Sequence, residues 1–220
     1  FALKSFSQKE ANIWYFGQNA GLDFNTNPPT ALTDGKIDTY EGCSSFSDED
    51  GKLLFYSDGI TVWDKNHDPM KYEDGSFAND LKGDPSSTQS GMIIPKPGST
   101  SIYYLFTVDD GPDFDRTGKI EDGKGLNAYT IDMSNGIGEV IQGPIDLSDG
   151  KFDDWTEKVA AVKGGICNTY WVVSAVNNQF YSYRLDGTGI DTAPVISTVP
   201  NSATRRGYLK ISPDGTKLAI

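Results

Sequence analysis

Short runs in which apolar and polar residues alternate fill most of this chain, and few stretches show the period of an amphipathic helix. The clearest group lies at 41–68, where Cys43–Ser47, Lys52–Ser57 and Ile60–Asp64 are separated by two short segments that each contain Asp-Gly. Asp-Gly between β-type runs predicts a hairpin, because glycine accepts the positive φ that tight turns require. We therefore expect a three-stranded antiparallel meander over 41–68.

Similar alternation predicts strands along the rest of the chain, as expected for a repeat protein. These further strands are expected at 12–17, 20–25, 31–33, 87–94, 101–108, 126–132, 138–142, 157–163, 169–175, 179–185, 193–199, 207–212 and 217–220. Four of the expected strands are similar in sequence and align as the second strand of successive repeat units: 53–56 (LLFY), 103–106 (YYLF), 170–173 (YWVV) and 217–220 (KLAI). A repeat of about 40–50 residues with four strands in each unit is typical of a β-propeller. A β-sandwich of evenly spaced strands is the alternative.

We therefore predict an all-β fold, a propeller of four-stranded blades similar to WD40-repeat and TolB-like propellers. Residues 1–11 are expected to be an N-terminal lead-in. Residues 12–220 are expected to form the propeller segment, which divides into blades as follows. Part of a closing blade is expected at 12–40, blade 1 at 41–82, blade 2 at 83–143, blade 3 at 144–200 and the start of blade 4 at 201–220. Known propellers have at least about four blades. This count predicts an incomplete ring from the front of a longer protein, and a sealed barrel or sandwich made of these residues alone would contradict it.

The composition of the chain disfavours some classes of binding partner. The chain has 19 Lys and Arg against 31 Asp and Glu, a net charge of −12, which disfavours binding to nucleic acid or to an anionic membrane. No apolar run approaches the roughly 18 residues of a membrane span, so we expect no membrane insertion. Cys43 and Cys167 have no metal-ligand spacing and are expected to be buried free thiols, with a disulfide as the alternative. The first residue is Phe1, which indicates a removed leader, and the abundance of Asn, Thr, Tyr, Gly and Asp fits an exported protein.

Segments spread in order over almost the whole chain carry a resemblance to a known family. They are 14–25 (WYFGQNAGLDFN), 31–35 (ALTDG), 41–48 (EGCSSFSD), 53–67 (LLFYSDGITVWDKNH), 83–90 (GDPSSTQS), 103–110 (YYLFTVDD), 125–133 (GLNAYTIDM), 157–163 (EKVAAVK), 170–173 (YWVV) and 207–219 (GYLKISPDGTKLA). They resemble the N-terminal propeller region of large secreted surface proteins of Bacteroidetes. Those proteins carry, far downstream, a gliding-motility-associated or type B sorting domain that the type IX secretion system reads.

The resemblance implies a secreted cell-surface propeller, one module of a larger adhesin-like chain, with the secretion machinery as a partner during export. It implies no catalytic residue. The chain departs from the pattern at 164–166 (GGI), where relatives more often carry His or Asn. That departure weakens any inference of a shared polar site there.

Nucleophilic hydrolysis finds little support. His67 is the single histidine and lies in a polar turn, where a structural or solvent-exposed role is expected. A serine or cysteine nucleophile needs a base of this kind beside it. The chain has no G-x-S-x-G elbow and no phosphate-binding loop. We therefore assign no catalytic residue.

Carboxylates offer candidate ligand-binding residues. Glu41, Asp84 and Glu157 each open the expected innermost strand of a unit, so in a propeller they would ring the mouth of the central channel. Such a ring binds a cation or sugar hydroxyls, supplies the two carboxyls of a glycoside hydrolase, or anchors neighbouring blades by accepting backbone N–H bonds. Trp155 follows two aspartates in an expected loop, where an exposed ring would stack on a sugar and a packed ring would not.

Calcium is the one candidate ion, and no organic cofactor is predicted. Oxygen ligands cluster in the acidic loop at 109–125, where Asp109, Asp110, Asp113 and Asp115 are the candidate metal ligands. Their spacing does not match an EF-hand loop.

The favoured function is a binding, adhesion or scaffold module with a glycan or protein ligand at the cell surface. A glycoside hydrolase or glycan-binding protein that uses the channel-mouth carboxylates is the first alternative. Secretion cargo with no site in this segment is the second. Three tryptophans inside strands, Trp14, Trp63 and Trp171, are expected in the core between blades.

Overall fold

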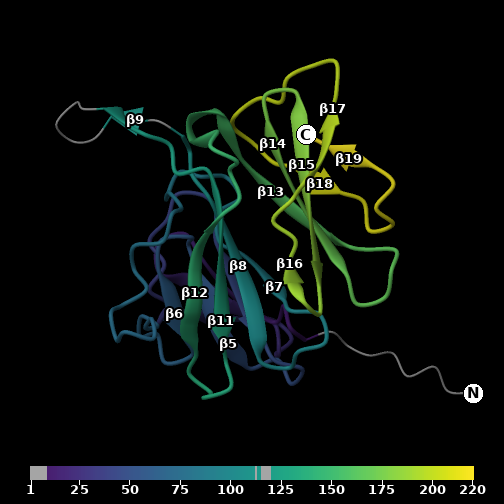
Figure 1. Ribbon diagram of the computed structural model, residues 1–220. Coiled ribbons are helices and arrows are strands. Elements are labelled where there is room, and N and C mark those ends of the chain that lie inside the picture. The colour runs from purple at the N-terminus through teal and green to yellow at the C-terminus, as the bar shows by residue number, and fades with distance from the viewer. Residues whose placement is uncertain (1–8, 112, 115–119) are drawn as a thin grey trace, which may run out of the picture.

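A computed structural model describes residues 9–111, 113–114 and 120–220 (Figure 1). These residues form an all-β fold, and the one helical turn among them is the short 3-10 helix η1 (Phe152–Asp154). No helix in this part of the chain has the length and apolar character needed to cross a membrane. The predicted all-β class is confirmed.

The strands form several antiparallel sheets in chain order. The first sheet has the order β1-β2-β3, with β1 at Ile13–Phe16, β2 at Ala20–Asp23 and β3 at Thr30–Leu32. The second has the order β4-β5-β6, with β4 at Ser44–Ser47, β5 at Leu53–Ser57 and β6 at Val62–Asp64. The third has the order β12-β11-β8-β7, with β7 at Met92–Pro95, β8 at Ile102–Val108, β11 at Leu126–Asp132 and β12 at Glu139–Asp146.

The fourth sheet and two hairpins complete the set. The fourth sheet runs β13 (Trp155–Lys163), β14 (Tyr170–Val176), β15 (Gln179–Asp186) and β16 (Gly189–Ile190), and β17 (Val195–Thr198) also pairs with β15. One hairpin joins β9 (Asp113–Phe114) to β10 (Ile120–Glu121), and the other joins β18 (Lys210–Ile211) to β19 (Leu218–Ala219).

The predicted meander over 41–68 is confirmed by the register of the second sheet. Phe46 pairs with Phe55 and Tyr56 pairs with Trp63. Gly51 and Gly59 in its two turns have φ of 85° and 87°, the conformation for which glycine was expected. The expected strands elsewhere are also present, with shifts of a few residues at their ends.

Two expectations about strand limits were wrong. The strand expected at 87–94 is limited to Met92–Pro95, because the residues before it bond to other sheets. The strand expected at 138–142 extends to Asp146 as β12, although Pro144 lies within it. β12 lies at the edge of its sheet, where a missing N–H costs no ladder bond.

Neighbouring sheets pack through separate apolar clusters. Tyr15, Tyr56 and Trp63 are buried between the first two sheets. Clusters around Leu105 and Phe106 connect the third sheet to the second and to the fourth. Each sheet therefore buries its apolar face against the next along the chain.

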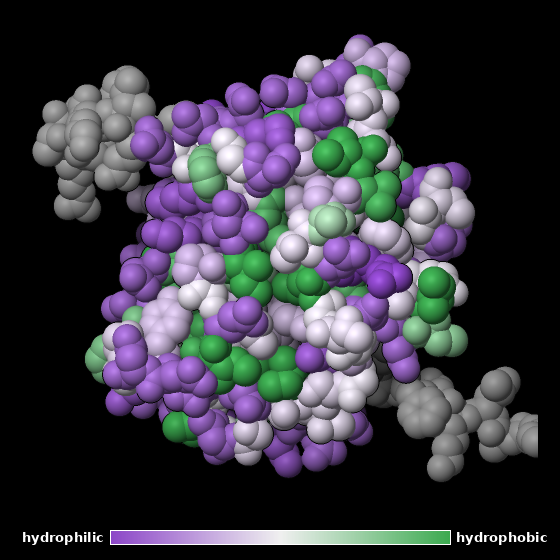
Figure 2. All heavy atoms as spheres, in the orientation of Figure 1, coloured by the Kyte–Doolittle hydropathy of each residue, from purple (hydrophilic) through white to green (hydrophobic). Residues whose placement is uncertain are grey.

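Strands of neighbouring sheets also contact one another. β4 contacts both β1 and β7, and β13 contacts both β8 and β18. Figure 1 shows β5, β6, β8, β11 and β12 in one half and β13 to β19 mostly in the other. No strand pairing in the described ranges joins these sheets into one closed sheet. On the face shown in Figure 2, apolar side chains gather in patches among polar ones.

The three tryptophans expected in the core differ in how far they are buried. Trp63 is buried as predicted, at 8% exposed. Trp14 is 48% exposed, so its predicted core position was wrong, and its ring lies 4.9 Å from that of Phe24 at the surface. Trp171 is partly buried. Cys43 and Cys167 are both free, as expected, but Cys43 is only partly buried and Cys167 is exposed, so their expected burial was wrong.

Candidate functional site

A loop at the centre of the molecule, Gly83–Gly91, connects the inner ends of several sheets, and we call it the hub loop. Its sequence favours turns over a ladder: the Asp84 carboxylate accepts the backbone N–H of Ser86 at 2.8 Å, and Gly91 has a φ of 79°. Lys124 also donates its ammonium to the Gly83 carbonyl at 3.2 Å. The backbone groups of this loop are not paired in a β-sheet, so they can form hydrogen bonds with other segments of the chain.

One side of the hub loop holds the chain that leads into β4. The Pro85 carbonyl accepts N–H bonds from Tyr40 at 3.1 Å and from Glu41 at 3.2 Å, and the Ser87 carbonyl accepts that of Gly42 at 2.9 Å. A Cβ at Gly42 would collide with backbone atoms of the hub loop. Only glycine fits this approach without a shift of the backbone.

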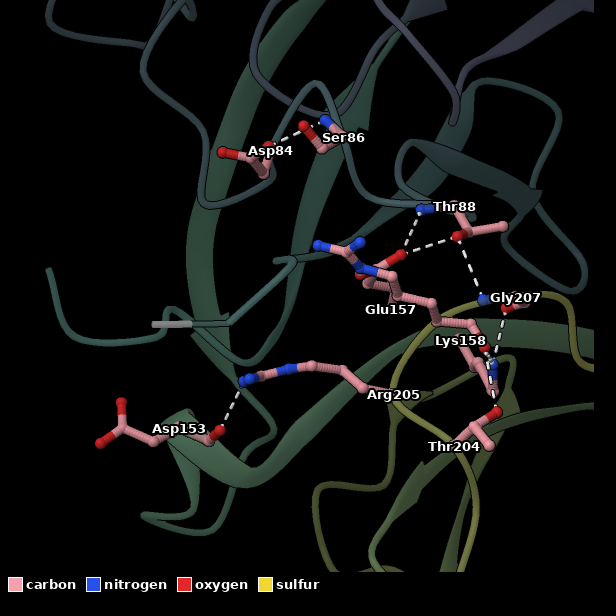
Figure 3. A network of polar contacts seen from close by, with 10 residues as sticks. Asp84, Ser86, Thr88, Asp153, Glu157, Lys158, Thr204, Arg205 and Gly207 are labelled. Atoms are coloured by element: carbon pink, nitrogen blue, oxygen red, sulfur yellow. Dashed lines mark hydrogen bonds and ion pairs between the residues drawn. The ribbon is translucent and has the colours of Figure 1, made fainter. Parts of the chain in front are cut away.

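The other side of the hub loop holds the start of β13 through Glu157 (Figure 3). The Glu157 Oε2 atom accepts the Thr88 N–H at 3.2 Å and the Thr88 hydroxyl at 2.7 Å. Glu157 is 1% exposed, and its Oε1 accepts no hydrogen bond from any described residue. The guanidinium of Arg206, which is itself 84% exposed, lies 3.6 Å from that atom. Glu157 is thus a buried anchor whose charge is only weakly compensated.

The segment before β18 is fixed by groups from both the hub loop and β13. Gln89 makes two bonds to the backbone of Leu209, accepting its N–H at 2.6 Å and donating to its carbonyl at 3.2 Å. The buried ammonium of Lys158 donates to the carbonyls of Arg206 and Gly207, and burial lowers the Lys158 pKa. These directional bonds set the spacing between β13 and the segment before β18.

A cavity of about 480 Å³, the central pocket, lies where these segments meet. Its lining comes from the hub loop and from residues in or just before β4, β7, β13 and β18: Glu41, Gly42, Cys43, Ser44, Thr88, Gln89, Ser90, Met92, Val159, Ala160, Ala161, Tyr208, Leu209, Lys210 and Ile211. The volume falls in the range of small-ligand sites, about 300–1,000 Å³. A larger cavity of about 580 Å³ beside the β18–β19 hairpin is lined mainly by β13 to β17 and that hairpin, without the hub loop.

The polar groups of the central pocket are varied. Glu41 is exposed, and Tyr208 is 60% exposed with the Lys210 ammonium 4.9 Å from its ring centre. The buried hydroxyl of Ser90 has no hydrogen-bond partner among the described residues, but it lies beside Gly59 and Gly83, which do not line the pocket. Buried polar atoms in native proteins are normally satisfied, by protein, water or ligand. The pocket therefore combines an aromatic face, an acid and a base.

The three carboxylates expected at the channel mouth occupy three different environments. Glu41 lines the central pocket, and Glu157 is buried between the hub loop and Arg206. Asp84 is not among the lining residues; it lies with Asp109 and Asp110, where one oxygen of each falls within 4.8 Å of the others. The anchoring alternative thus describes Glu157, whose carboxylate accepts a backbone N–H from the hub loop.

Of the two alternatives for Trp155, the packed ring is the one observed, so Trp155 is not a ligand-binding residue. Trp155 is 1% exposed, and its indole N–H donates to the Ser174 hydroxyl at 2.8 Å. β13 begins at Trp155 itself, two residues before the predicted start, which places the ring in the core against Tyr181. A ring with no exposed face offers nothing for a sugar to stack upon.

The candidate metal ligands are only partly described. The buried Asp109 accepts the Lys124 N–H at 2.7 Å, and the Lys124 ammonium lies 3.6 Å away. Burial raises the pKa of Asp109. Asp115 and the side chain of Asp113 lie outside the described residues. A cluster of Asp84, Asp109 and Asp110 is a group that could hold a metal ion, and it includes one residue expected elsewhere.

The sequence analysis missed Gln89, Tyr208 and Lys210 as pocket residues. A signal was present, because Tyr208 and Lys210 open the innermost strand of the last unit just as Glu41 precedes that of the first. The grouping of Asp84 with Asp109 was also foreseeable. β7 and β8 are antiparallel, so the residues before β7 and after β8 meet at one edge.

The chain matches no family model, no curated protein and no solved structure.

Proposed function

We propose that this chain is a secreted, cell-surface binding module with β-propeller architecture, and that its central pocket receives a glycan. The observation that carries the proposal is the central pocket itself. Residues from the inner ends of separate sheets line it, and it presents Tyr208, Glu41 and Lys210 together. Convergence of a few polar groups in a formed cavity is the usual sign of a ligand site.

The propeller arrangement is supported by the order of strands. The third sheet is a four-stranded antiparallel meander, and the fourth begins in the same way from its inner strand β13. The inner strands β4 and β7 contact each other, as do β13 and β18. Radial meanders whose first strands surround one centre are typical of a propeller.

Binding is favoured over glycoside hydrolysis by the carboxylates. Hydrolysis by the usual route needs two carboxyl groups about 5–10 Å apart, facing the same bond. Glu41 is the only carboxylate among the lining residues that the structure describes. Glu157 is held by Thr88 and is 1% exposed, so it would have to leave its hydrogen bonds to act on a substrate.

A glycan is the ligand class that suits this lining best. Sugars present apolar ring faces, which stack on aromatic side chains, and hydroxyls, which both donate and accept hydrogen bonds. Tyr208 supplies an exposed ring, Glu41 an acceptor and Lys210 a donor.

Calorimetric titration with cellohexaose, xylohexaose, laminarihexaose and chitohexaose tests the proposal. At least one of these should bind, and Tyr208→Ala should weaken binding about fivefold, since an aromatic contact contributes about 1 kcal/mol. Tyr40→Ala is the matched control, because Tyr40 is 82% exposed and does not line the pocket. Equal loss in both variants, or no binding at all, would contradict the proposal. Release of reducing ends in the same mixtures would favour the hydrolase alternative.

Export to the cell surface rests on the resemblance of the ten segments given above. Detection of the full-length protein on intact cells, and its retention inside cells that lack the secretion machinery, would support that part of the proposal. A surface protein with no glycan or protein ligand would instead fit secretion cargo.

We further propose Ca²⁺ as the ion for Asp84, Asp109 and Asp110. Ca²⁺ takes carboxylate oxygens, and adding it would relieve repulsion between the close carboxylates. Thermal unfolding in CaCl₂ and in EGTA tests this. CaCl₂ should raise the Tm of the unaltered chain and of Asp154→Asn, but not of Asp84→Asn. An equal rise in all three would contradict the assignment.

A further inference from the structure

A third cavity, of about 570 Å³, shares no lining residue with the central pocket; we call it the outer groove. One wall is the segment 64–71 together with Phe77, and the other is the turn between β11 and β12 at 135–139. The two walls come from the second and third sheets. Val140 donates its N–H to the Lys71 carbonyl at 2.9 Å, and Tyr72 forms an isolated parallel bridge with Val140.

The floor of the outer groove is apolar. Pro69 and the buried Met70 lie at its base, and Phe77 and Ile137 face it from opposite walls. Phe77 is 52% exposed and Ile137 is 48% exposed. Two exposed large apolar side chains on facing walls form a surface that an aliphatic chain can cover.

The rim of the outer groove is acidic. Asp64, Asp68 and Glu139 line it together with one base, Lys71, and the ammonium of the exposed Lys65 lies near Gly136 in the opposite wall. Asp64 is already used, since its Oδ1 accepts the N–H groups of Asn66 at 2.7 Å and Asp68 at 3.1 Å. In the described ranges, no hydrogen bond or ion pair engages the carboxylates of Asp68 and Glu139. Two carboxylates are thus free to receive a donor.

Lys71 shows where a cation fits in this groove. Its ammonium lies 5.4 Å from the centre of the Phe77 ring, within the distance at which a cation is attracted to an aromatic face. Lys71 therefore occupies a place that a cation from outside would also favour. Its charge also repels any incoming cation.

We propose that the outer groove binds a basic peptide segment, with a lysine or arginine side chain laid across Phe77 and Ile137. The aliphatic stem of such a side chain covers the apolar floor, while its charged head reaches Asp68 and Glu139. The excess of carboxylates over ammonium groups in the lining supplies the charge complementarity. A neutral sugar would gain nothing from that excess.

Fluorescence anisotropy with two labelled octapeptides tests the proposal, one alternating Lys and Ala and the other alternating Glu and Ala. The lysine peptide should bind at low ionic strength and lose affinity in 0.5 M NaCl, because rim charges are screened. The glutamate peptide should not bind. Equal binding of both peptides, or stronger binding of a neutral hexasaccharide at this groove, would overturn the proposal.

Two variants of opposite expected effect locate the site. Glu139→Gln should weaken the lysine peptide about threefold, and Lys71→Met should strengthen it about threefold, because exposed charge pairs have effects of this size. Asp154→Asn is the charge-matched control on a distant exposed acid and should lower affinity by less than Glu139→Gln. Far-ultraviolet circular dichroism checks that each variant is folded.

The sign of the Lys71→Met effect is the decisive outcome. A neutral ligand would lose a donor in that variant and bind more weakly, which would contradict a cationic ligand. Tyr208→Ala should leave peptide binding unchanged, since Tyr208 lines only the central pocket of the two cavities. A loss in Tyr208→Ala would place the peptide in the central pocket instead.

Discussion

The centre of the molecule and the spaces between its sheets are packed by different means. Between the third and fourth sheets, Phe106, Val172 and Tyr183 are completely buried in an apolar cluster. At the centre, the buried groups are instead Thr88, Glu157 and Lys158, and they bond across from one segment to another. Apolar burial has no direction, whereas hydrogen bonds fix distance and register. The sheets are thus held together by apolar contact, and the shape of the central pocket is set by polar contact.

The largest expected effect is in the apolar cluster. Phe106→Ala should lower the free energy of unfolding by about 4 kcal/mol, because it removes a fully buried ring and leaves a cavity. Urea denaturation measures the loss. Phe152→Ala is the control, since Phe152 is 38% exposed, and it should cost less than about 1 kcal/mol. Similar losses in both variants would show that the cluster does not carry the packing between these sheets.

The next effect is in the polar centre. Glu157→Ala should cost about 3 kcal/mol, because it leaves the N–H and hydroxyl of Thr88 without their acceptor in a buried site. Glu157→Gln keeps an acceptor oxygen and should cost about 1 kcal/mol. Urea denaturation of both variants compares them. If the two substitutions cost the same, Thr88 does not depend on the acceptor and the centre is not held as described.

A smaller effect concerns pH at the boundary between the first and second sheets. There the Tyr15 hydroxyl donates to Asp34 at 2.8 Å, and His67 lies 3.4 Å from the other Asp34 oxygen. The Tyr15 bond, with a lesser contribution from His67, lowers the pKa of Asp34, while burial raises the pKa of Tyr15. A lowered carboxyl pKa contributes stability above the unfolded pKa, about 4, and this is lost as pH falls through the folded pKa.

Asp34→Asn should therefore lose stability relative to the unaltered chain above about pH 4, and the difference should shrink in more acid solution. Denaturation between pH 2 and pH 7 measures it. The Asp34 side chain is 59% exposed, so solvent screening keeps the difference small. A difference that grows as the pH falls would contradict the assigned direction of the pKa.

Strands and turns could be predicted from the sequence because their signals are local. Alternation and the two Asp-Gly turns located β4, β5 and β6 to within two residues. The first part of the strand expected at 87–94 is absent because the partners of Thr88 and Gln89 lie about 70 and 120 residues away along the chain. No local pattern reports such partners.

The sequence predicted the positions of the candidate site residues along the chain better than the directions of their side chains. Glu41, Asp84 and Glu157 do lie near the starts of inner strands, but strand position alone does not say where a side chain points. β13 starts at Trp155 and contains a register shift between Trp155 and Val159. A bulge of this kind changes which residues face the core. Trp155 and Glu157 are both buried, which matches the packed and anchoring alternatives and not the ligand-binding ones.

Cys43 gives the most direct test of the central pocket, because it lines that pocket while Cys167 is exposed elsewhere. Burial raises the pKa of Cys43, so alkylation by iodoacetamide is best followed near pH 9. In Cys167→Ser, which keeps Cys43 as the only thiol, a saturating hexasaccharide from the binding panel should slow alkylation several-fold. In Cys43→Ser the same sugar should leave alkylation of Cys167 unchanged. An unchanged rate at Cys43 with bound sugar would contradict the central pocket as the ligand site.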